Sequence, residues 1–342
     1  MKILVPTVYP TVSGSTRVLL AAANALATAH DVVVRGPFPQ ADEQTRLAFP
    51  NHALDSSLAK LRAMPLLARI VTAEAFNLRG RGFDVIYVHD GPSLYAYSVV
   101  ARLVKAKLVC HVHLRGSGLL EEIRTRFALS SIHISDHCAA DEPHVIIRNP
   151  VTAPLIRRKP NPDELVVAGS ISRRKNQLLA VDALAILLER GFQARLRLCG
   201  DVLDADYVRQ ARERAKHIKA EGRIIYDGFV PPQDYLTTAS CLLMPSLAEN
   251  QPLALLEAIA AEVPVVASDI PAHRELVDLG CLPPGALAPL TAEAFAEGVM
   301  RAQKMCDAAK YAGRVREIFS AEKFSTELAT FFRAIERQRT AR

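Results

Sequence analysis

The sequence lacks three features that would assign the protein to a class at once. It has no CxxC pair, no apolar run of about 18–20 residues, and no basic run interleaved with stacking aromatics. Its six cysteines are widely scattered, which fits buried thiols in a reducing compartment. These absences disfavour a disulfide scaffold, a transmembrane protein and a nucleic-acid binder.

A secretion signal is also missing at the N-terminus. Met1 is followed by the short apolar run Ile3–Val5 and not by the longer apolar stretch of a signal peptide. We therefore expect a cytoplasmic protein. Basic residues flank residues 64–68, and two interpretations stay open: peripheral contact with the inner face of a membrane, or a solvated helix face. These residues are Lys60, Arg62, Arg69, Arg79 and Arg81, with Arg102, Lys105 and Lys107 nearby in sequence.

Length and composition indicate a two-domain globular protein. The chain has 342 residues, of which 50% are hydrophobic and 23% charged. Short β-rich apolar runs alternate with helical patterns, which is typical of parallel βαβ units. The fold class is therefore α/β, with two Rossmann-like doubly wound domains facing across a cleft. The expected strands are 2–8, 31–35, 84–89, 107–114, 131–135 and 145–148, then 165–168, 194–199, 223–226, 241–244 and 263–267.

The domain boundary is predicted in the proline-rich stretch from Asn149 to Asp163. Four prolines and three basic residues there resist both helix and central strand. The domains are accordingly 1–150 and 151–320. Residues 321–342 place apolar side chains at helical spacing, so we expect a terminal helix that packs back across the lobes.

The most informative stretch, residues 244–269, reads MPSLAENQPLALLEAIAAEVPVVASD, a strand, a loop, a helix and a strand. Pro252 suits the first helical turn, and Asn250 or Gln251 can cap it. The free amides that follow, from Leu253 on, form an anion site suited to a diphosphate.

Two acids accompany this helix start. Glu249 precedes the helix, and Glu257 lies in its second turn among apolar residues. A buried carboxylate needs partners, which the hydroxyls of a ribose or of a sugar can supply. The alternative is that both glutamates are structural acids that cap loops.

These residues resemble the glycosyltransferase group 1 family, the retaining family 4 transferases with the GT-B fold. The hallmark of that family is two glutamates eight positions apart, as Glu249 and Glu257 are, within PS…E…P…LEA…PVVASD. The resemblance covers most of the second lobe. It implies a nucleotide-sugar-binding C-terminal domain and an acceptor-binding N-terminal domain.

The run VVAGSISRRKNQLLAVDAL looks like the phosphate-binding loop of the family. Gly169 lies in it, Lys175 matches a phosphate-binding lysine, and Ser170 stands where an arginine is usual, so Arg173 or Arg174 has to substitute. As an alternative, the cations are simply exposed on a loop.

Two more positions of the second lobe enter through the resemblance. Gly228 to Val230 lie where the nucleotide base contacts backbone. Glu262 replaces the usual glycine before PVV at a helix end, where the requirement is conformational.

The first lobe resembles the family more loosely. Of the glycine pair that is usual in the family, only Gly14 is present. We expect the loop at residues 13–16, which contains Gly14, to approach the donor. His113 matches an active-site histidine, with His89 and His111 as rivals. A metal pair of His111 and His113 is conceivable because they share one face of a strand, but without a carboxylate or cysteine partner we expect no metal.

A DxD sequence at Asp204 and Asp206 opens a helix, where acids are favourable in any case, and we assign it no catalytic role.

The resemblance implies a metal-independent, hexosyltransferase-like enzyme that needs no cofactor. It would transfer a sugar with retention from a UDP- or GDP-sugar to a hydroxyl of a saccharide or lipid-linked saccharide, in bacterial-type polysaccharide or glycolipid assembly. Lys175 and the amides would stabilise the leaving group, Glu249 would hold the sugar, Glu257 the ribose, and His113 would line the acceptor side. The alternatives are a catalytically silent nucleotide-sugar-binding subunit and a sugar-nucleotide epimerase of the same fold.

Overall fold

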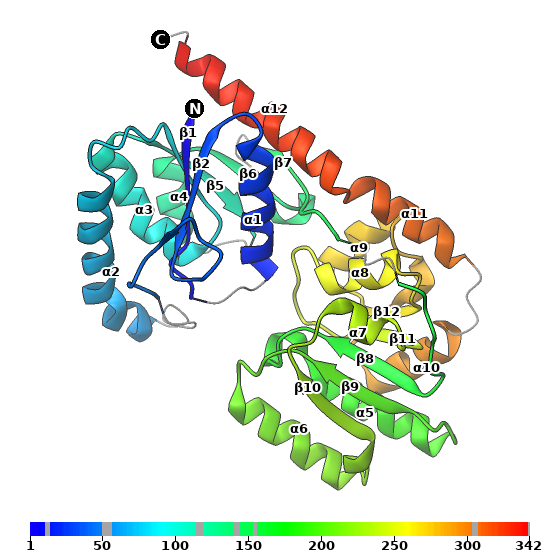
Figure 1. Ribbon diagram of the computed structural model, residues 1–342. Coiled ribbons are helices and arrows are strands. Elements are labelled where there is room, and N and C mark those ends of the chain that lie inside the picture. The colour runs from blue at the N-terminus through cyan, green and yellow to red at the C-terminus, as the bar shows by residue number, and fades with distance from the viewer. Residues whose placement is uncertain are drawn as a thin grey trace. The chain divides into compact units, whose positions relative to one another are not determined.

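The computed structural model describes residues 1–10, 14–49, 57–113, 119–139, 144–152, 156–302 and 307–340. The chain divides into two compact units, Met1–Pro150 with Ala321–Arg342 and Val151–Ser320 (Figure 1). Each unit has a parallel sheet with helices packed on it, so the expected α/β class with two Rossmann-like domains is confirmed. The units are described separately below.

The first unit has a seven-stranded sheet in the order β3-β2-β1-β4-β5-β6-β7. All its neighbouring strands pair in parallel. The chain runs outward from β1 to β2 and β3, then returns to the other side of β1 with β4. The strands are β1 Lys2–Pro6, β2 Asp31–Gly36, β3 Glu43–Gln44, β4 Val85–Val88, β5 Lys107–Val112, β6 Ala128–His133 and β7 His144–Ile146.

Helices of the first unit form two groups. α2, α3 and α4 pack together, whereas α1 packs against the C-terminal helix α12 (Figure 1). Their bounds are α1 Gly14–Ala27, α2 Ser57–Leu78, α3 Gly91–Val104, α4 Leu119–Phe127, the 3₁₀ turn η1 Asp136–Cys138 and α12 Ala321–Thr340.

The terminal helix α12 buries the apolar positions that its spacing predicted. Phe324, Leu328, Phe332 and Ile335 are all buried. Phe332 meets Tyr87 of β4 edge to face, with 5.1 Å between ring centroids. This aromatic contact attaches the end of the chain to the sheet of the first unit.

The second unit has a six-stranded sheet in the order β10-β9-β8-β11-β12-β13. Its strands are β8 Glu164–Ala168, β9 Arg195–Cys199, β10 Ile224–Gly228, β11 Cys241–Met244, β12 Val265–Ser268 and β13 Leu287–Ala288. Its helices and turns are η2 Arg173–Lys175, α5 Gln177–Glu189, α6 Ala205–His217, η3 Glu221–Arg223, α7 Pro232–Leu236, α8 Leu253–Ala260, α9 Pro271–Asp278, η4 Pro284–Ala286, α10 Ala292–Ala302 and α11 Ala308–Ile318.

The sequence analysis did not predict two of the strands, and several strands begin or end at residues other than those predicted. β3 and β13 are only two residues long, too short to show an alternating pattern. Strand β6 begins at Ala128, three residues before the predicted start at Ser131. Gly14 opens helix α1, so residues 14–16 form its first turn and not the expected loop, while residues 11–13 lie outside the described residues.

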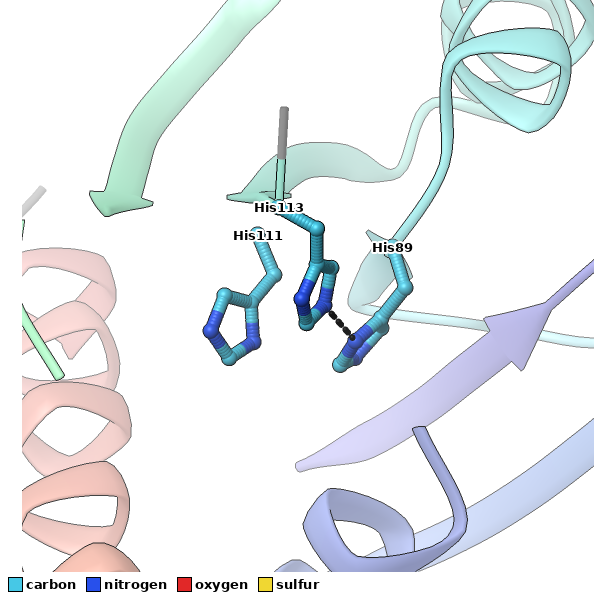
Figure 2. Close-up of side chains that lie close together, drawn as sticks. All are labelled: His89, His111 and His113. Atoms are coloured by element: carbon cyan, nitrogen blue, oxygen red, sulfur yellow. Dashed lines mark hydrogen bonds between the residues drawn. The ribbon is translucent and has the colours of Figure 1, made fainter. Parts of the chain in front are cut away.

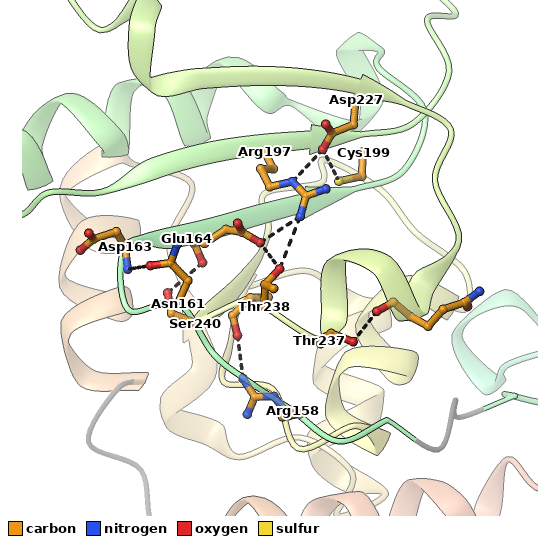
Figure 3. Close-up of polar contacts among 12 residues, drawn as sticks. Arg158, Asn161, Asp163, Glu164, Arg197, Cys199, Asp227, Thr237, Thr238 and Ser240 are labelled. Carbon is orange, nitrogen blue, oxygen red and sulfur yellow. Dashed lines mark hydrogen bonds and ion pairs between the residues drawn. The ribbon is translucent and has the colours of Figure 1, made fainter.

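The proline-rich boundary segment is attached to the second unit by hydrogen bonds rather than by regular structure. The Arg158 guanidinium donates to the carbonyl oxygens of Ala239 at 2.6 Å and Glu262 at 2.7 Å, and Asn161 N donates to Thr238 O at 2.7 Å. Next to it, Arg197 of β9 bridges Glu164 and Asp227, 3.0 and 2.8 Å away (Figure 3). Ion pairs therefore link β8, β9 and β10 beside this segment.

The cysteines behave as expected of buried thiols. All five that lie within the described residues are free and buried, and Cys306 lies outside them. Burial raises the pKa of Cys110, Cys199 and Cys241 to about 12. Across the described residues, every helix is too short or too polar to cross a bilayer.

Glu262 occupies the position where α8 ends, and its backbone explains why glycine is usual there. Its φ is +59°, in the left-handed region. Glu262 N donates to Ile259 O at 2.9 Å and Val263 N to Ala258 O at 2.9 Å, the two bonds of a Schellman motif. The interpretation of Glu262 as a helix-end position is therefore consistent with the structure.

Replacing Glu262 by glycine should stabilise the second unit. Glycine adopts positive φ without a Cβ clash, which we expect to raise the free energy of unfolding by about 0.5–1 kcal/mol. Urea unfolding measures the change, with Glu262→Ala as control. Alanine also loses the ion pair with Arg316 but keeps the strain, so it should be no more stable than the parent. A glycine variant no more stable than the alanine variant would contradict this account.

Candidate functional site

The second unit has a topological switch point between β8 and β11. From β8 the chain runs outward to β9 and β10, and β11 then returns to the other side of β8. Ligands of open parallel sheets bind outside the carboxyl ends of the strands at such a point. Two loops start there, residues 169–176 after β8 and 245–252 after β11.

These two loops are joined by an ion-paired cluster of Arg174, Lys175 and Glu249. Lys175 Nζ lies 2.6 Å from Glu249 Oε1, and Arg174 Nη1 lies 3.2 Å from Oε2. Arg174 Nη1 also donates to Ala248 O at 2.8 Å, and its own carbonyl accepts from Leu247 N at 2.8 Å. Residues 74 or 75 positions apart in sequence are thus brought to one place, as the motif interpretation requires.

Glu249 is ionised although its side chain is only 6% exposed. Burial by itself raises the pKa of a carboxyl. The charges of Lys175 and Arg174, with hydrogen bonds from Lys175 and Ser246, outweigh burial and bring the pKa of Glu249 below its ordinary value. The cluster holds two cations and one anion, so it keeps a net positive charge for an anionic ligand.

Glycine at 169 and 200 brings the backbone close to Lys175. Gly169 has φ +137°, and a Cβ there would lie 3.2 Å from Lys175 Cε and 3.4 Å from Nζ. A Cβ on Gly200 would lie 2.1 Å from Gly169 O, an impossible contact. Lys175 therefore lies against Gly169, and the backbone of Gly169 lies in turn against Gly200, where no side chain fits.

Ser170 stands where the family has an arginine, and the structure shows which neighbouring arginine lies beside Glu249 instead. The Ser170 carbonyl accepts from Gln177 Nε2 at 3.0 Å. Arg173 is 61% exposed at its side chain, pairs with Asp204 at 3.4 Å and lies over the Tyr207 ring. Arg174, not Arg173, is therefore the second cation beside Glu249.

The start of α8 differs in detail from the prediction. Pro252 is the N-cap residue rather than the first helical residue, and neither Asn250 nor Gln251 takes the N-cap position. The cap side chain makes no hydrogen bond because proline has no polar group to offer. The first helical hydrogen bond runs from Leu256 N to Pro252 O at 3.0 Å. Hence the amides of Leu253 and the next two residues precede the helical ladder, as an anion site requires.

Glu257 and Val230, two other predicted donor contacts, lie in the same unit. Glu257 is 3% exposed, on a helix whose other central side chains are apolar. Val230 is half-buried and follows Gly228, whose φ is +68°. Asp204 caps α6 by accepting from Tyr207 N at 2.9 Å, which fits the capping role predicted for the DxD sequence.

The predicted histidine of the first unit belongs to a group of three. His89, His111 and His113 stand at the carboxyl ends of β4 and β5 with their rings close together (Figure 2). His89 Nδ1 lies 3.2 Å from His113 Nε2. The ring centroids of His111 and His113 are 4.5 Å apart and those of His89 and His111 4.8 Å apart.

Burial keeps these three imidazoles neutral. It lowers the pKa of His113 to about 4 and, with the neighbouring rings, holds the pKa of His89 and His111 well below the usual range. The Tyr87 hydroxyl lies 2.7 Å from His111 Nδ1, and Asn149 Nδ2 lies 3.3 Å from His113 Nδ1. Within the described part of the chain, these two hydrogen-bonding neighbours of the group, a phenol and an amide, are uncharged.

Sequence reasoning treated the three histidines as rivals and missed that they form one group. The signal lay in the parallel register, in which Val88 pairs with Cys110, so that His89 and His111 follow on adjacent strands. Gly14, also predicted at the donor, lies in this unit. Gly14 and His113 are therefore in one unit, and the Lys175–Glu249 cluster is in the other.

The buried histidines predict a loss of stability on acidification. A histidine titrates at about 6.5 in the unfolded chain, whereas His113 titrates at about 4 in the folded protein. Between these values the unfolded chain binds more protons, so the free energy of unfolding falls as the pH falls from about 6.5 toward 4. The slope is at most about 1.4 kcal/mol per pH unit for each such histidine.

Urea unfolding in chelator-containing buffer between about pH 7 and pH 5 measures this slope. His113→Asn should flatten it, whereas the exposed His217→Asn should leave it unchanged. Equal slopes in all three proteins would show that His113 does not stay neutral on folding.

The chain is similar to known proteins in three comparisons. Residues 162–304 match the sequence model of the family described as Glycosyl transferases group 1. A curated relative, the alpha-monoglucosyldiacylglycerol synthase of Streptococcus pneumoniae, is 27% identical over 116 residues. That match covers 33% of this chain and 26% of the relative, so it spans about a quarter of the relative's length.

Solved structures resemble the chain over nearly its whole length. HepE of Anabaena, crystallised with UDP and glucose, has a TM-score of 0.79 at 20% identity and covers 97% of this chain and 99% of its own. Sucrose-phosphate synthase from Thermosynechococcus elongatus has a TM-score of 0.80 at 16% identity, with 98% and 99% covered. At these identities the likeness establishes the fold. Residues 162–304 therefore match the sequence model of the Glycosyl transferases group 1 family, and the chain has the two-Rossmann-domain GT-B fold.

Proposed function

We propose that this protein is a retaining glycosyltransferase that moves a hexosyl group from a UDP-sugar to a hydroxyl of a saccharide or glycolipid acceptor. The observation that carries the proposal is the cluster of Lys175, Arg174 and Glu249 at the switch point of the second unit. It combines a cationic anion site and a buried carboxylate, the two groups that transfer from a nucleotide sugar requires.

The leaving group of such a transfer is a nucleoside diphosphate, which gains negative charge as the glycosidic bond breaks. Lys175, Arg174 and the free amides at the start of α8 supply positive charge and N–H donors without reorganisation. This set performs the task that a metal ion performs elsewhere, so we propose transfer without a metal at the diphosphate. Gly169 and Gly200 allow the phosphates to approach the backbone closely.

Glu249 is suited to the sugar and Glu257 to the ribose. An ionised carboxylate only accepts hydrogen bonds, so it binds hydroxyls and rejects phosphate. Glu249 also places negative charge where the reacting sugar develops positive charge at its anomeric carbon. Glu257, buried on α8, would accept from both ribose hydroxyls.

Retention and the acceptor role of His113 are proposed from the match to the family pattern. His113 is neutral, so it can accept a hydrogen bond from an acceptor hydroxyl through an unprotonated ring nitrogen.

A UDP-sugar is proposed over a GDP-sugar because HepE structures of this fold hold UDP, UDP with glucose, or UDP-glucose. The curated relative is named for a glucosylated lipid and another structural neighbour for an outer-core galactosyltransferase of lipopolysaccharide. These names support a glycolipid or polysaccharide acceptor.

Donor turnover tests the proposal. The protein is incubated with UDP-, GDP-, ADP- and dTDP-hexoses, with and without acceptors, and nucleotide release and the anomer of the product are measured. We expect UDP-hexose to be consumed with retention. Glu249→Gln and Lys175→Met should each lower kcat by about 10²–10³-fold, because each removes charge that acts on the transition state.

The arginine pair provides the matched comparison. Arg174→Gln should lower kcat with UDP-hexose. Arg173→Gln should keep kcat near that of the parent protein, because the Arg173 side chain pairs with Asp204 and not with Glu249. A donor that binds and is never consumed would favour a catalytically silent subunit. A change of the donor sugar without transfer would favour an epimerase.

Gly169→Ala should weaken donor binding by displacing Lys175. The added Cβ would meet the lysine side chain, and φ +137° is strained for any L residue, at a cost of about 1–3 kcal/mol of stability. Gly191→Ala is the control, since φ is +86° there and nothing lies within 4 Å. Both variants should unfold more easily, but only Gly169→Ala should raise the Kd for UDP. Equal Kd values for UDP in the two variants would show that Lys175 does not bind the diphosphate.

A further inference from the structure

We propose that His89, His111 and His113 form a binding site for a divalent transition-metal ion, with zinc as the expected occupant. The three residues offer one ring nitrogen each, and these atoms all lie within 4.8 Å of one another. The site uses residues of the first unit only, and metal binding can be measured without the proposed transferase reaction. A metal on Nε2 of His113 would replace the acceptor contact proposed for that nitrogen.

The geometry of the trio is close to that of three zinc ligands. Zinc–nitrogen bonds of about 2.0–2.1 Å in a tetrahedral site require nitrogen atoms roughly 3.3 Å apart. His89 Nδ1 and His113 Nε2 are already 3.2 Å apart. The rings project from neighbouring strand ends into one space, as Figure 2 shows, so side-chain rotation of His111 can bring in the third nitrogen.

Buried ring nitrogens without hydrogen-bond partners point to a ligand. Nε2 of His111 is buried and, within the described residues, has no hydrogen-bond partner. Nε2 of His89 is in the same state, although the nitrogen that His89 offers to the metal is Nδ1, 3.2 Å from His113 Nε2. Such atoms are costly unless something satisfies them. His111 already uses Nδ1 on the Tyr87 hydroxyl, which leaves Nε2 to carry the lone pair when Nδ1 is protonated.

The surroundings would orient the ligands as in known zinc sites, where the second ring nitrogen of a histidine is held by a hydrogen bond. The Tyr87 hydroxyl lies 2.7 Å from His111 Nδ1 and can accept a hydrogen bond from it. Asn149 Nδ2 lies 3.3 Å from His113 Nδ1, and with the amide turned over its Oδ1 would accept from the Nδ1–H of a metal-bound His113. Metal binding would then use Nε2 of both histidines, with the His111 ring rotated toward the other two. Neutral imidazole, the form that binds metals, is the form that this buried environment favours.

The donor set selects the class of ion. Three imidazoles with no carboxylate suit zinc or a neighbouring first-row ion and not magnesium or calcium, which need oxygen ligands. Asp90, the nearest acid in sequence, is already occupied. It accepts from Ser93 N at 2.7 Å, from Ser93 Oγ at 2.7 Å and from Thr7 Oγ1 at 3.0 Å. A water molecule would take the fourth position, as in other three-histidine sites.

Titration of the chelator-treated protein with Co²⁺, followed by visible absorption, and with Zn²⁺ in competition tests this proposal. We expect one ion per chain and a tetrahedral Co²⁺ spectrum that zinc abolishes. His89→Asn and His111→Gln should each weaken binding at least tenfold. His133→Gln is the matched control, since His133 is equally buried, lies on the adjacent strand β6 and stands outside the trio.

Histidine side-chain NMR of the parent protein keeps the test valid where a variant fails to fold. Zinc should shift the ring-nitrogen resonances of His89, His111 and His113 and leave those of His133 and His217 in place. Absence of stoichiometric binding, or shifts confined to other histidines, would overturn the proposal. Both measurements omit any nucleotide sugar, so the metal site and the transferase activity succeed or fail separately.

Discussion

The second unit depends on the pairing of a nearly buried carboxylate, that of Glu249, with Lys175. A buried, ionised carboxylate is costly unless a cation and hydrogen bonds compensate for lost hydration. Here Lys175 reaches it from the loop after β8, where it lies against Gly169, and Gly200 packs in turn against the backbone of Gly169. The pair therefore joins the two loops of the switch point.

The fold and most of this cluster could be predicted from sequence patterns that span only a few neighbouring residues. The period of the apolar runs located the long strands within a few residues, because each buries both faces in a parallel sheet. Strands β3 and β13 escaped because two residues carry no period. The spacing of Glu249 and Glu257 indicated the site. The choice between Arg173 and Arg174 stayed open because adjacent residues on a tight turn point in directions that only the folded backbone determines.

The histidine trio could not be predicted in the same way, because it depends on register between strands. His111 and His113 share a face of β5 by the alternation of side chains, which the sequence shows directly. The position of His89 beside them requires that β4 and β5 be neighbours and that Val88 pair with Cys110. A sequence lists strands in chain order, and a sheet order of β1-β4-β5 is a tertiary result.

The two polar groups follow opposite electrostatic principles, and this difference explains what each is suited to bind. The second unit compensates one buried charge with two opposite charges, which leaves a site that attracts a polyanion. The three histidines of the first unit carry no charge, since burial among aromatic rings favours neutral imidazole. His89 and His113 share one hydrogen bond between their ring nitrogens, and a metal ion placed there would accept a lone pair from each ring instead. A cationic cluster thus suits a diphosphate, whereas a neutral trio of imidazoles suits a metal ion.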